Sequence, residues 1–298
     1  MIVHMDIKNP LAAPPASQKL SAFGQLLRHW RQVRTISQLE LAAQAETSQR
    51  YISFLESGRA RPSREMIVRL SDTLDIPLRE RNRLFTAARF APVYPEGRLD
   101  GPELSAVRDG LELLLSYSDP HATIVVDRCW NLVMGNRATM NLFNEFIDLE
   151  ETWKEIGHEG EKNILRMLFH PKGLRRFISN WESVAYQTLS RVRREHMNMG
   201  GDARAEMILE EIAQYEGFPK GWIVPDWSEA LPLPVAPFEL EKHGLKLVFH
   251  TLIATFGTPQ DVTLQELRVE TFLPSDGATA AYMKALSARG AGAAVEEC

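Results

Sequence analysis

Apolar residues recur every three or four positions along five segments of the first ninety residues. That spacing places them on one face of an α-helix, so it predicts five short amphipathic helices. The helices are expected over residues 21–34, 38–45 and 49–56, then over one segment that starts near Ser63 and one between Arg79 and Arg89. The pattern indicates a compact all-α bundle.

Serine and glycine residues mark the ends of these helices. Ser37 is followed three residues later by Glu40, which is a capping box: each side chain accepts a hydrogen bond from a backbone N–H at the helix start. Ser48 can cap the third helix, and Gly58 can end it in a left-handed conformation. Three small or apolar residues are the expected packing positions of the second helix: Leu39, Ala42 and Ala43.

After residue 103 the period of the pattern changes twice. Residues 104–117 keep helical spacing, whereas Ala122–Val126 is typical of a buried strand and Trp130–Met134 of its hairpin partner. Asn136 can then cap a helix that runs to Phe146. This order of strand, turn, strand and capped helix is similar to the start of a PAS domain.

The rest of the chain mixes helices and strands. Residues 163–215 are predicted to be mostly helical, and 219–237, rich in proline, are predicted to form loop and edge strand. Residues 245–256 and 262–273 are two long strand candidates. Residues 284–298 end in alanine and glycine and are predicted to be a frayed tail.

The composition is ordinary for a soluble globular protein, with 44% hydrophobic and 24% charged residues. No run of about 18 apolar residues occurs, so no contact with a membrane is expected. Residues 1–18 lack the apolar core of a secretory signal and are expected to be a flexible leader. Cys129 and Cys298 are the only cysteines, which excludes a disulfide framework and fits a reducing cytoplasm.

The charge is unevenly distributed along the chain. Residues 19–90 carry thirteen basic and seven acidic residues, which gives a net charge of +6. Residues 1–18 carry one acidic and one basic residue, so their net charge is zero. Because the whole chain has a net charge of −5, the remainder carries −11. A basic lobe joined to an acidic one predicts nucleic acid at the N-terminal end only.

Two short helices joined by a tight turn inside a helical bundle form the helix-turn-helix DNA reader. The exposed start of the third predicted helix carries Gln49, Arg50 and Ser53. Glutamine and arginine have the forked geometry that reads adenine and guanine edges in the major groove, so we expect these residues to read bases. Contacts to DNA phosphates are expected from four residues: Gln38, Arg59, Arg61 and Arg64. The alternative is a helical bundle whose arginines are merely solvated.

An ordered run of residues carries a resemblance to a known family. The matching residues are Ser37–Gln38, Glu40–Ala42, Tyr51–Ser53, Leu55–Arg59 and Arg61–Ser63. In these positions the sequence resembles the lambda-repressor/Cro-like family, also called the xenobiotic response element family. The resemblance implies Gln38 on a phosphate and Gln49, Arg50 and Ser53 at base edges.

Two residues of the third predicted helix, the DNA-reading helix over residues 49–56, need a separate interpretation. Phe54 departs from those family members that are polar at this position; it can touch a thymine methyl group or pack against the fourth helix, and packing is the preferred interpretation. A carboxylate aimed at a phosphate would be repelled, so Glu56 is expected to be a structural partner for a neighbouring arginine or backbone group.

A second resemblance covers nearly the whole chain. It is carried by Leu78–Asn82, Ala87–Ala88, Ala91–Pro92, Ile124–Asp127, Trp130–Asn131, Asn136, Asn163, His170–Pro171, Gly173, Asn180–Trp181, Thr255–Thr258, Asp261–Thr263, Glu266–Arg268 and Glu270–Pro274. These positions resemble the MmyB-like transcription regulators. The resemblance implies a PAS-like sensor that binds a fatty-acid-like molecule. Arg89 stands where family members have glycine, so the turn into the linker is expected to differ.

No motif for catalysis is found in the sequence. It has no phosphate-binding glycine loop, no His-Glu-x-x-His zinc helix and no Gly-x-Ser-x-Gly nucleophile turn, so we expect no enzyme and no metal site. His170, before Pro171, is expected to be a helix-end hydrogen-bonding residue. A haem or flavin sensor with His170 or His196 as axial ligand is a third class of function that the residues leave open.

An apolar ligand needs an apolar pocket and usually a polar group for its head. The residues predicted to form such a pocket are Trp130, Phe169, Phe177, Trp181, Trp222 and Phe249, with Arg194 for the head. The competing interpretation is that these aromatic residues form an ordinary core.

The sequence therefore predicts an α+β protein: a five-helix helix-turn-helix domain followed by a PAS-like α+β sensor. The expected boundaries are 1–18 leader, 19–90 DNA-binding domain, 91–103 linker, 104–283 sensor and 284–298 tail. The expected function is a regulator that binds a double-stranded DNA operator as a homodimer and senses a small apolar ligand, without a resident cofactor. The alternative is a DNA-binding protein whose rear domain serves only dimerisation or protein contact.

Overall fold

The computed structural model describes residues 21–157, 160–218 and 236–293. Its residue contacts divide the chain into two compact units. The first holds the residues up to Asp75 together with Arg83–Ala91, and the second holds Ile76–Asn82 and the residues from Pro92 onward. Among the described residues, no helix is both long and apolar enough to cross a membrane.

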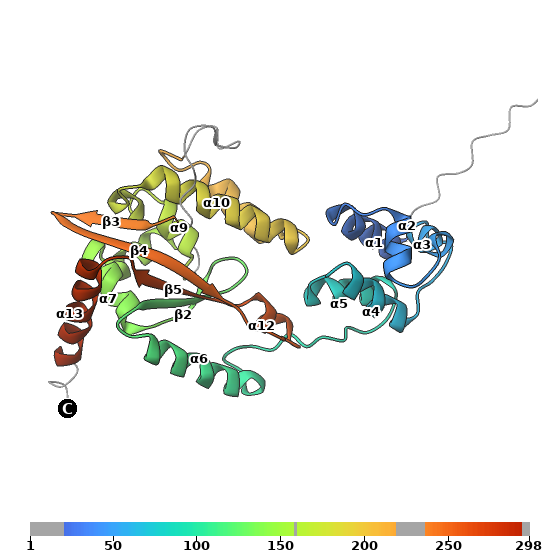
Figure 1. Cartoon of the computed structure of the whole chain (residues 1–298), viewed down its shortest axis with the longest axis horizontal. Helices are drawn as coiled ribbons and strands as arrows, with labels where there is room; N and C mark the ends of the chain where they lie inside the picture. The colour runs from blue at the N-terminus through green and yellow to red at the C-terminus, as the bar shows by residue number, and fades with distance from the viewer. Residues whose placement is uncertain (1–20, 158–159, 219–235, 294–298) are drawn as a thin grey trace, which may run out of the picture. The chain divides into compact units, whose positions relative to one another are not determined.

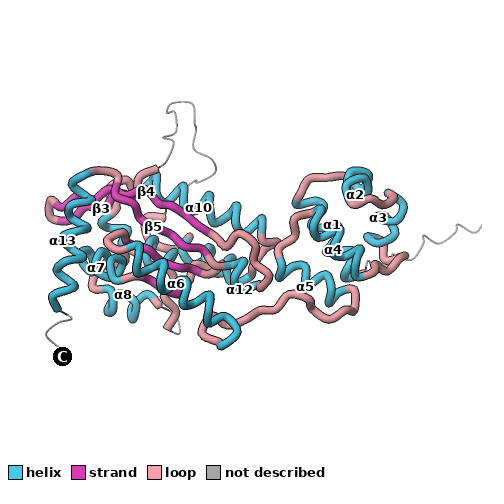
Figure 2. The backbone as a smooth tube through the Cα atoms, turned by 60° about the horizontal axis from the view of Figure 1, so that its bottom comes forward, coloured by secondary structure: helices cyan, strands magenta, loops and turns pink. Residues whose placement is uncertain are grey.

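The first unit is built from helices, as the colouring of Figure 2 shows. Its helices are α1 (Ala22–Val33), α2 (Gln38–Gln44), α3 (Gln49–Glu56), α4 (Arg64–Thr73) and the C-terminal part of α5 (Leu78–Ala87). Serine side chains cap the first four of them, at Ser21, Ser37, Ser48 and Ser63. The five helices predicted from the apolar spacing are confirmed.

The core of the first unit corrects one expectation about α2. Leu41, Ala42 and Ala45 are buried in this helix and its C-cap, whereas Leu39 and Ala43 are exposed. The prediction of Leu39 and Ala43 as packing positions was therefore wrong. The helix has only seven residues, and apolar spacing over so short a segment does not fix which side of the helix is buried.

The second unit combines a sheet with helices on both of its sides (Figure 1). Its helices are α6 (Ser105–Ser118), α7 (Arg137–Phe146), α8 (Leu149–Ile156), α9 (Ile164–Phe169), α10 (Trp181–Asn198), α11 (Ala203–Ile212), α12 (Val262–Glu266) and α13 (Gly277–Ala293), with 3-10 turns η1 (Pro102–Leu104) and η2 (Leu174–Phe177). Its strands are β1 (Ala122–Val126), β2 (Leu132–Gly135), β3 (Phe238–Lys242), β4 (Leu245–Ala254) and β5 (Arg268–Pro274). With the helical first unit, this confirms an α+β protein.

The described strands form one antiparallel sheet in the order β2-β1-β5-β4-β3. Helix α6 covers one face, where Leu111 and Leu115 pack with Val125 and Val269. The opposite face carries the larger core, in which strand residues such as Phe249 pack against helical ones. Part of the candidate sensor site, including Phe249, belongs to this larger core.

The predicted hairpin of β1 and β2 is confirmed, but its second strand begins two residues later than predicted. The Asp127 carboxylate accepts hydrogen bonds from the backbone N–H of Cys129 over 2.8 Å and of Asn131 over 2.9 Å. Trp130 consequently takes a left-handed φ of 66°. Because the turn uses these residues, β2 begins at Leu132 rather than at Trp130.

Two predictions for the last third of the chain were wrong. Residues 262–273 do not form one strand, because the Asp261 side chain accepts from Leu264 N and starts α12, so β5 begins only at Arg268. The predicted frayed tail from residue 284 is helical as far as Ala293 in α13, and Leu286 is buried in the larger core. Most of the predicted loop at 219–237 lies outside the described residues.

Candidate functional site

A tight turn separates α2 from α3 in the first unit. The Thr47 backbone N–H donates to the Ala42 carbonyl over 2.8 Å, and Glu46 takes a left-handed φ of 50°. The Ser48 hydroxyl then accepts from Tyr51 N and starts α3. These contacts build the helix-turn-helix that the sequence predicts.

One side of helix α3 is buried in the core of the first unit, and the other side faces the solvent. Ile52 and Leu55 have no exposed surface, which fixes the rotation of the helix. Gln49 and Arg50 are exposed on its first turn, and Ser53 is half-buried one turn later. The structure therefore brings the three predicted base-reading residues together on one side of the N-terminal part of a helix-turn-helix second helix, where base edges are read.

The buried carboxylate of Glu56 joins three helices. Arg31 of α1 donates from Nε to Glu56 Oε1 over 2.7 Å and from Nη2 to Oε2 over 3.2 Å. Gln38, the first residue of α2, donates from Nε2 to Glu56 Oε2 over 2.8 Å. The predicted structural role of Glu56 is confirmed, with Arg31 as its arginine. The amide of Gln38 is thereby fixed at the start of α2, beside the backbone N–H groups that attract a phosphate.

Helices α1 and α3 approach each other at Gly24. A Cβ atom on this residue would lie 2.2 Å from the carbonyl oxygen of Glu56 and 2.7 Å from that of Leu55. Both neighbours are backbone atoms of α3, so an added methyl group forces the two helices apart. The glycine at this position sets the distance between the first helix and the reader helix.

Gly24→Ala is expected to destabilise the first unit by about 1–3 kcal/mol, because overpacking shifts backbone in a filled core. Thermal unfolding of the full chain measures the loss. Gly277→Ala is the control: a Cβ at this exposed position at the start of α13 meets no described atom within 4 Å, so stability should change by less than about 0.5 kcal/mol. Equal unfolding temperatures for Gly24→Ala and the unchanged chain would contradict the close approach.

The arginines predicted to contact phosphates lie in different surroundings. Arg59 and Arg61 are exposed after the end of α3. Arg64, at the start of α4, stacks its guanidinium carbon 5.2 Å from the Phe90 ring centroid.

Phe54 was predicted to pack against the fourth helix. The guanidinium carbons of Arg50 and Arg59 lie 5.2 and 5.9 Å from its ring centroid. Sequence reasoning missed this pair of contacts, although the four-residue spacing of Arg50 and Phe54 is a visible signal for the first.

The aromatic residues predicted to line a ligand pocket fall into two adjoining buried clusters. Trp130 and Phe169 belong to one, Phe249 belongs to the other with Phe177 packed against it, and Trp181 packs against both. The Phe169 and Trp181 ring centroids are 5.1 Å apart. Trp222, also predicted for the pocket, lies outside the described residues.

The predicted head-group residue Arg194 is exposed on α10, whereas Arg191, three residues earlier, reaches the core. Arg191 Nη2 donates to Glu270 Oε1 over 2.7 Å, and its guanidinium carbon lies 4.1 Å from the Trp130 ring centroid. Arg268, paired with Glu195, stacks on the same ring at 5.4 Å. Burial raises the pKa of the Glu270 carboxyl and lowers that of Arg191, which is the expected effect of removing both charges from water.

His170 ends α9, as its position before Pro171 predicts. Its Nδ1 accepts from the backbone N–H of Lys172 over 3.2 Å, and its ring packs edge-on against Tyr215 at 4.9 Å. Burial lowers the pKa of His170, so the imidazole favours its neutral form. Its predicted hydrogen-bonding role is confirmed.

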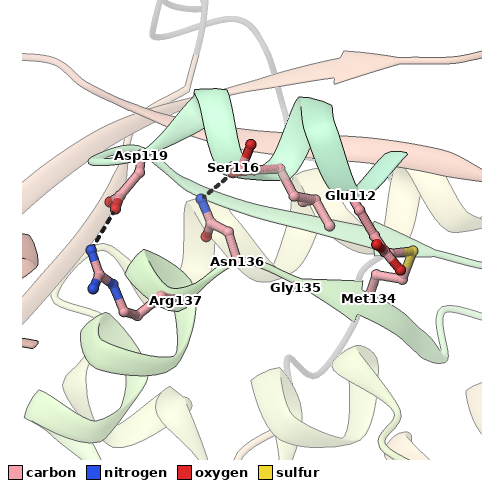
Figure 3. Close-up of a pocket in the computed structure, with 8 residues that line it drawn as sticks. Glu112, Ser116, Asp119, Met134, Gly135, Asn136 and Arg137 are labelled. Carbon is pink, nitrogen blue, oxygen red and sulfur yellow. Dashed lines mark hydrogen bonds and ion pairs between the residues drawn. The ribbon is translucent and has the colours of Figure 1, made fainter. Parts of the chain in front are cut away.

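An open cleft of about 520 Å³ lies between α6, β2 and the start of α7 (Figure 3). Its polar residues serve the fold: Arg137 pairs with Asp119 at 3.0 Å, and Asn136 caps α7 while donating to the Leu115 carbonyl. The cleft contains none of the residues predicted for a ligand pocket. It lies beside α6, whereas Phe177 and Phe249 belong to the core on the other face of the sheet.

Comparisons with known proteins also find two parts in the chain, a helix-turn-helix and a second domain. The family model described as MmyB-like transcription regulator ligand binding domain matches residues 107–286, more than half of the chain, and a model described as Helix-turn-helix matches residues 27–81. A search of curated protein sequences finds no match. A solved chain described as "Structure of an RNA-binding Light-Oxygen-Voltage Receptor" is 11% identical, with a TM-score of 0.25, over 91% of this chain and 63% of that one.

That structural similarity is too weak to place the fold, and this chain spans less than two thirds of the solved chain. The two family models, by contrast, cover the reader and the sheet domain in the order in which the structure builds them. The protein belongs to the DNA-binding transcription regulators that combine a helix-turn-helix with an MmyB-like ligand-binding domain.

Proposed function

We propose that this regulator reads its operator through α3 as a homodimer, and that its second unit is a PAS-like sensor of a small, fatty-acid-like molecule. The observation that carries the DNA-reading part is the group formed by exposed Gln49 and Arg50 and half-buried Ser53, on a helix whose Ile52 and Leu55 are fully buried. In this proposal Gln38, Arg59, Arg61 and Arg64 hold phosphates. The protein acts by binding rather than catalysis, in the cytoplasm.

Arg50→Ala is expected to weaken binding to an operator selected from random duplexes by about 1–3 kcal/mol and to relax the base preference at one position. A bidentate contact to a base edge is lost while the fold is kept, because Arg50 is exposed. Fluorescence anisotropy with the operator and its single-base variants measures both effects.

Arg61→Ala is the matched control, since Arg61 is also exposed but is assigned to a phosphate. It should weaken all sequences alike and reduce the slope of log affinity against log salt by about 1. An Arg50→Ala variant with unchanged affinity and base preference would refute the assignment of Arg50.

The sheet order supports a PAS-like sensor. The first two strands form a hairpin, the helices α7 to α11 follow, and the last strands return so that β5 lies beside β1. The strands that come first and last in the chain, β1 and β5, are thus paired inside the sheet. One face of the sheet is covered by the helices that connect β2 to β3. A face covered in this way is where a small fold can hold a ligand between sheet and helices.

Trp181 supports a ligand in that part of the second unit. Its indole Nε1 is buried and has no hydrogen-bond partner among the described residues. Its ring lies against Phe169, and the Arg175 guanidinium carbon is 5.2 Å from the ring centroid. A buried unpaired donor carries a cost of about 1–3 kcal/mol, and an oxygen atom of an otherwise apolar ligand would remove it. A fatty acid has this combination of a long apolar chain and a polar end.

Native mass spectrometry of the full chain, before and after organic extraction, tests the sensor. The proposal predicts a bound species of a few hundred daltons that is released by solvent and binds more weakly to Trp181→Phe, which keeps the ring and removes the N–H. Phe85→Leu, a buried substitution in the first unit, is the control and should leave the bound species unchanged. A chain that stays ligand-free and does not bind added myristate-length fatty acids would favour a rear domain for dimerisation or protein contact.

The exposed apolar face of α6 supports the homodimer. Leu113 and Tyr117 are exposed there, and the small residues Ala106 and Gly110 precede them on the same side of the helix. In an antiparallel pair around a two-fold axis, the large residues of one copy face the small residues of the other, so the surface complements itself. Two-fold symmetry in the selected operator tests this part of the proposal.

A further inference from the structure

Phe54 lies between two arginines on the exposed side of the reader. Its ring centroid is 5.2 Å from the guanidinium carbon of Arg50 and 5.9 Å from that of Arg59. Arg50 is one helical turn before Phe54 in α3, whereas Arg59 follows the end of the helix. One half-buried ring therefore contacts both the predicted base-reading arginine and a predicted phosphate-binding arginine.

The backbone of α3 builds this arrangement. The carbonyl oxygen of Phe54 accepts from the backbone N–H of Arg59 over 2.8 Å and of Ala60 over 3.2 Å. These two bonds fold the chain back over the last turn of α3 and bring Arg59 to the side chain of Phe54. The contact with Arg59 thus follows from the way the helix ends.

An arginine side chain has many rotamers, and it loses side-chain entropy when it is fixed in one of them. A ring within about 6 Å of the guanidinium attracts it through the negative face of the π-system. Part of the ordering is then already present before DNA binds, so less affinity is lost on binding. The ring also keeps the two cations side by side, where a polyanion relieves their repulsion.

We propose that Phe54 is a positioning residue that orders Arg50 for base reading and Arg59 for phosphate binding at the same time. The proposal rests on the proposed function of α3 as the DNA reader. It gives the aromatic residue at this position a role in both specificity and affinity without any contact between Phe54 and DNA. The two alternatives are that Phe54 contacts a thymine methyl group or that it only packs against the fourth helix, and the experiment distinguishes both from the proposal.

The experiment measures operator affinity for Phe54→Leu and Phe54→Tyr in the full chain and in the Arg50→Ala, Arg59→Ala double variant. Phe54→Leu should bind about 3- to 10-fold more weakly, since it loses two cation–π contacts. Phe54→Tyr keeps the ring and should bind within twofold of the unchanged chain. In the double variant, Phe54→Leu should have no further effect, because Phe54 acts through the two arginines.

Several results would overturn the proposal. A loss that persists in the double variant and depends on one thymine would assign Phe54 a direct methyl contact. A Phe54→Leu variant that binds as well as Phe54→Tyr would leave no role for the ring. Should Phe54→Leu lower the unfolding temperature, Phe54→Met, which is flexible and non-aromatic, replaces it, and equal affinity of Phe54→Met and Phe54→Tyr would equally contradict positioning. A full chain that selects no operator at all would instead refute the proposed function.

Discussion

Arg191→Leu is expected to destabilise the second unit by about 3–5 kcal/mol, because it leaves the buried Glu270 carboxylate without its closest cation. The Glu270 side chain is almost completely buried, and Arg191 Nη2 is 2.7 Å from its Oε1. Arg268, the next cation, is already paired with Glu195. Denaturant unfolding measures the loss, and hydrogen exchange assigns it to the second unit.

The pH dependence of this variant gives a second, independent readout. Burial already raises the pKa of Glu270, and without Arg191 the pKa rises further. A carboxyl whose pKa is raised in the folded state keeps its full stability below its unfolded pKa of about 4.3 and loses stability as the pH rises through the folded value. The destabilisation by Arg191→Leu should therefore be larger at pH 8 than at pH 5.

Two further variants complete the test of the buried pair. Arg194→Leu is the matched control on the same helix and should change stability by less than about 0.5 kcal/mol, because Arg194 is exposed. Adding Glu270→Gln to Arg191→Leu should restore part of the stability and remove most of the pH dependence. An Arg191→Leu variant as stable as Arg194→Leu at pH 8 would mean that Glu270 is hydrated in solution.

Glu56→Ala is expected to destabilise the first unit by about 3 kcal/mol and to abolish operator binding at the same time. The substitution removes the acceptor for both Arg31 and Gln38, so α1 and α2 lose their polar attachment to α3. The guanidinium of Arg31 is left largely buried without a carboxylate, which is costlier than removing both partners. Thermal unfolding and anisotropy with the selected operator measure the two effects.

Glu46→Ala is the control for this prediction. Glu46 makes a loose 3.8 Å ion pair with Arg69 on the surface, and pairs of that kind contribute about 0–1 kcal/mol. Replacing Glu56 by glutamine should have an intermediate effect, since an amide oxygen in the place of Oε2 still accepts two of the three hydrogen bonds, those from Arg31 Nη2 and Gln38. Equal stability of Glu56→Ala and Glu46→Ala would show that Glu56 does not hold the three helices together.

The reader could be predicted from sequence because its signals are local. The capping box of Ser37 and Glu40 and the cap at Ser48 fix where α2 and α3 begin, and both operate within three residues of the chain. Apolar spacing then shows which side of α3 is exposed, so Gln49, Arg50 and Ser53 could be chosen without coordinates. The role of Glu56 followed from charge, but its partner Arg31 is twenty-five residues away and could not be identified.

The second unit was harder to predict because its decisive contacts link distant segments. Nothing local distinguishes Arg191 from Arg194: both are arginines on α10, and only the sheet residue Glu270 shows which one points inward. Residues 262–264 have apolar or β-branched side chains, yet the cap at Asp261 makes this segment helical. The C-terminal helix has little amphipathic pattern, and the burial of Leu286 depends on a core assembled from the whole unit.

The central claim, that α3 reads a specific DNA sequence, is tested most directly by selecting bound duplexes from a random pool with the full chain and with Arg50→Ala. We predict that the full chain enriches one sequence with two symmetric half-sites about one helical turn apart, and that Arg50→Ala loses the preference at one base of each half-site. A pool that remains random after selection with the full chain, at salt concentrations where non-specific binding is weak, would contradict the claim.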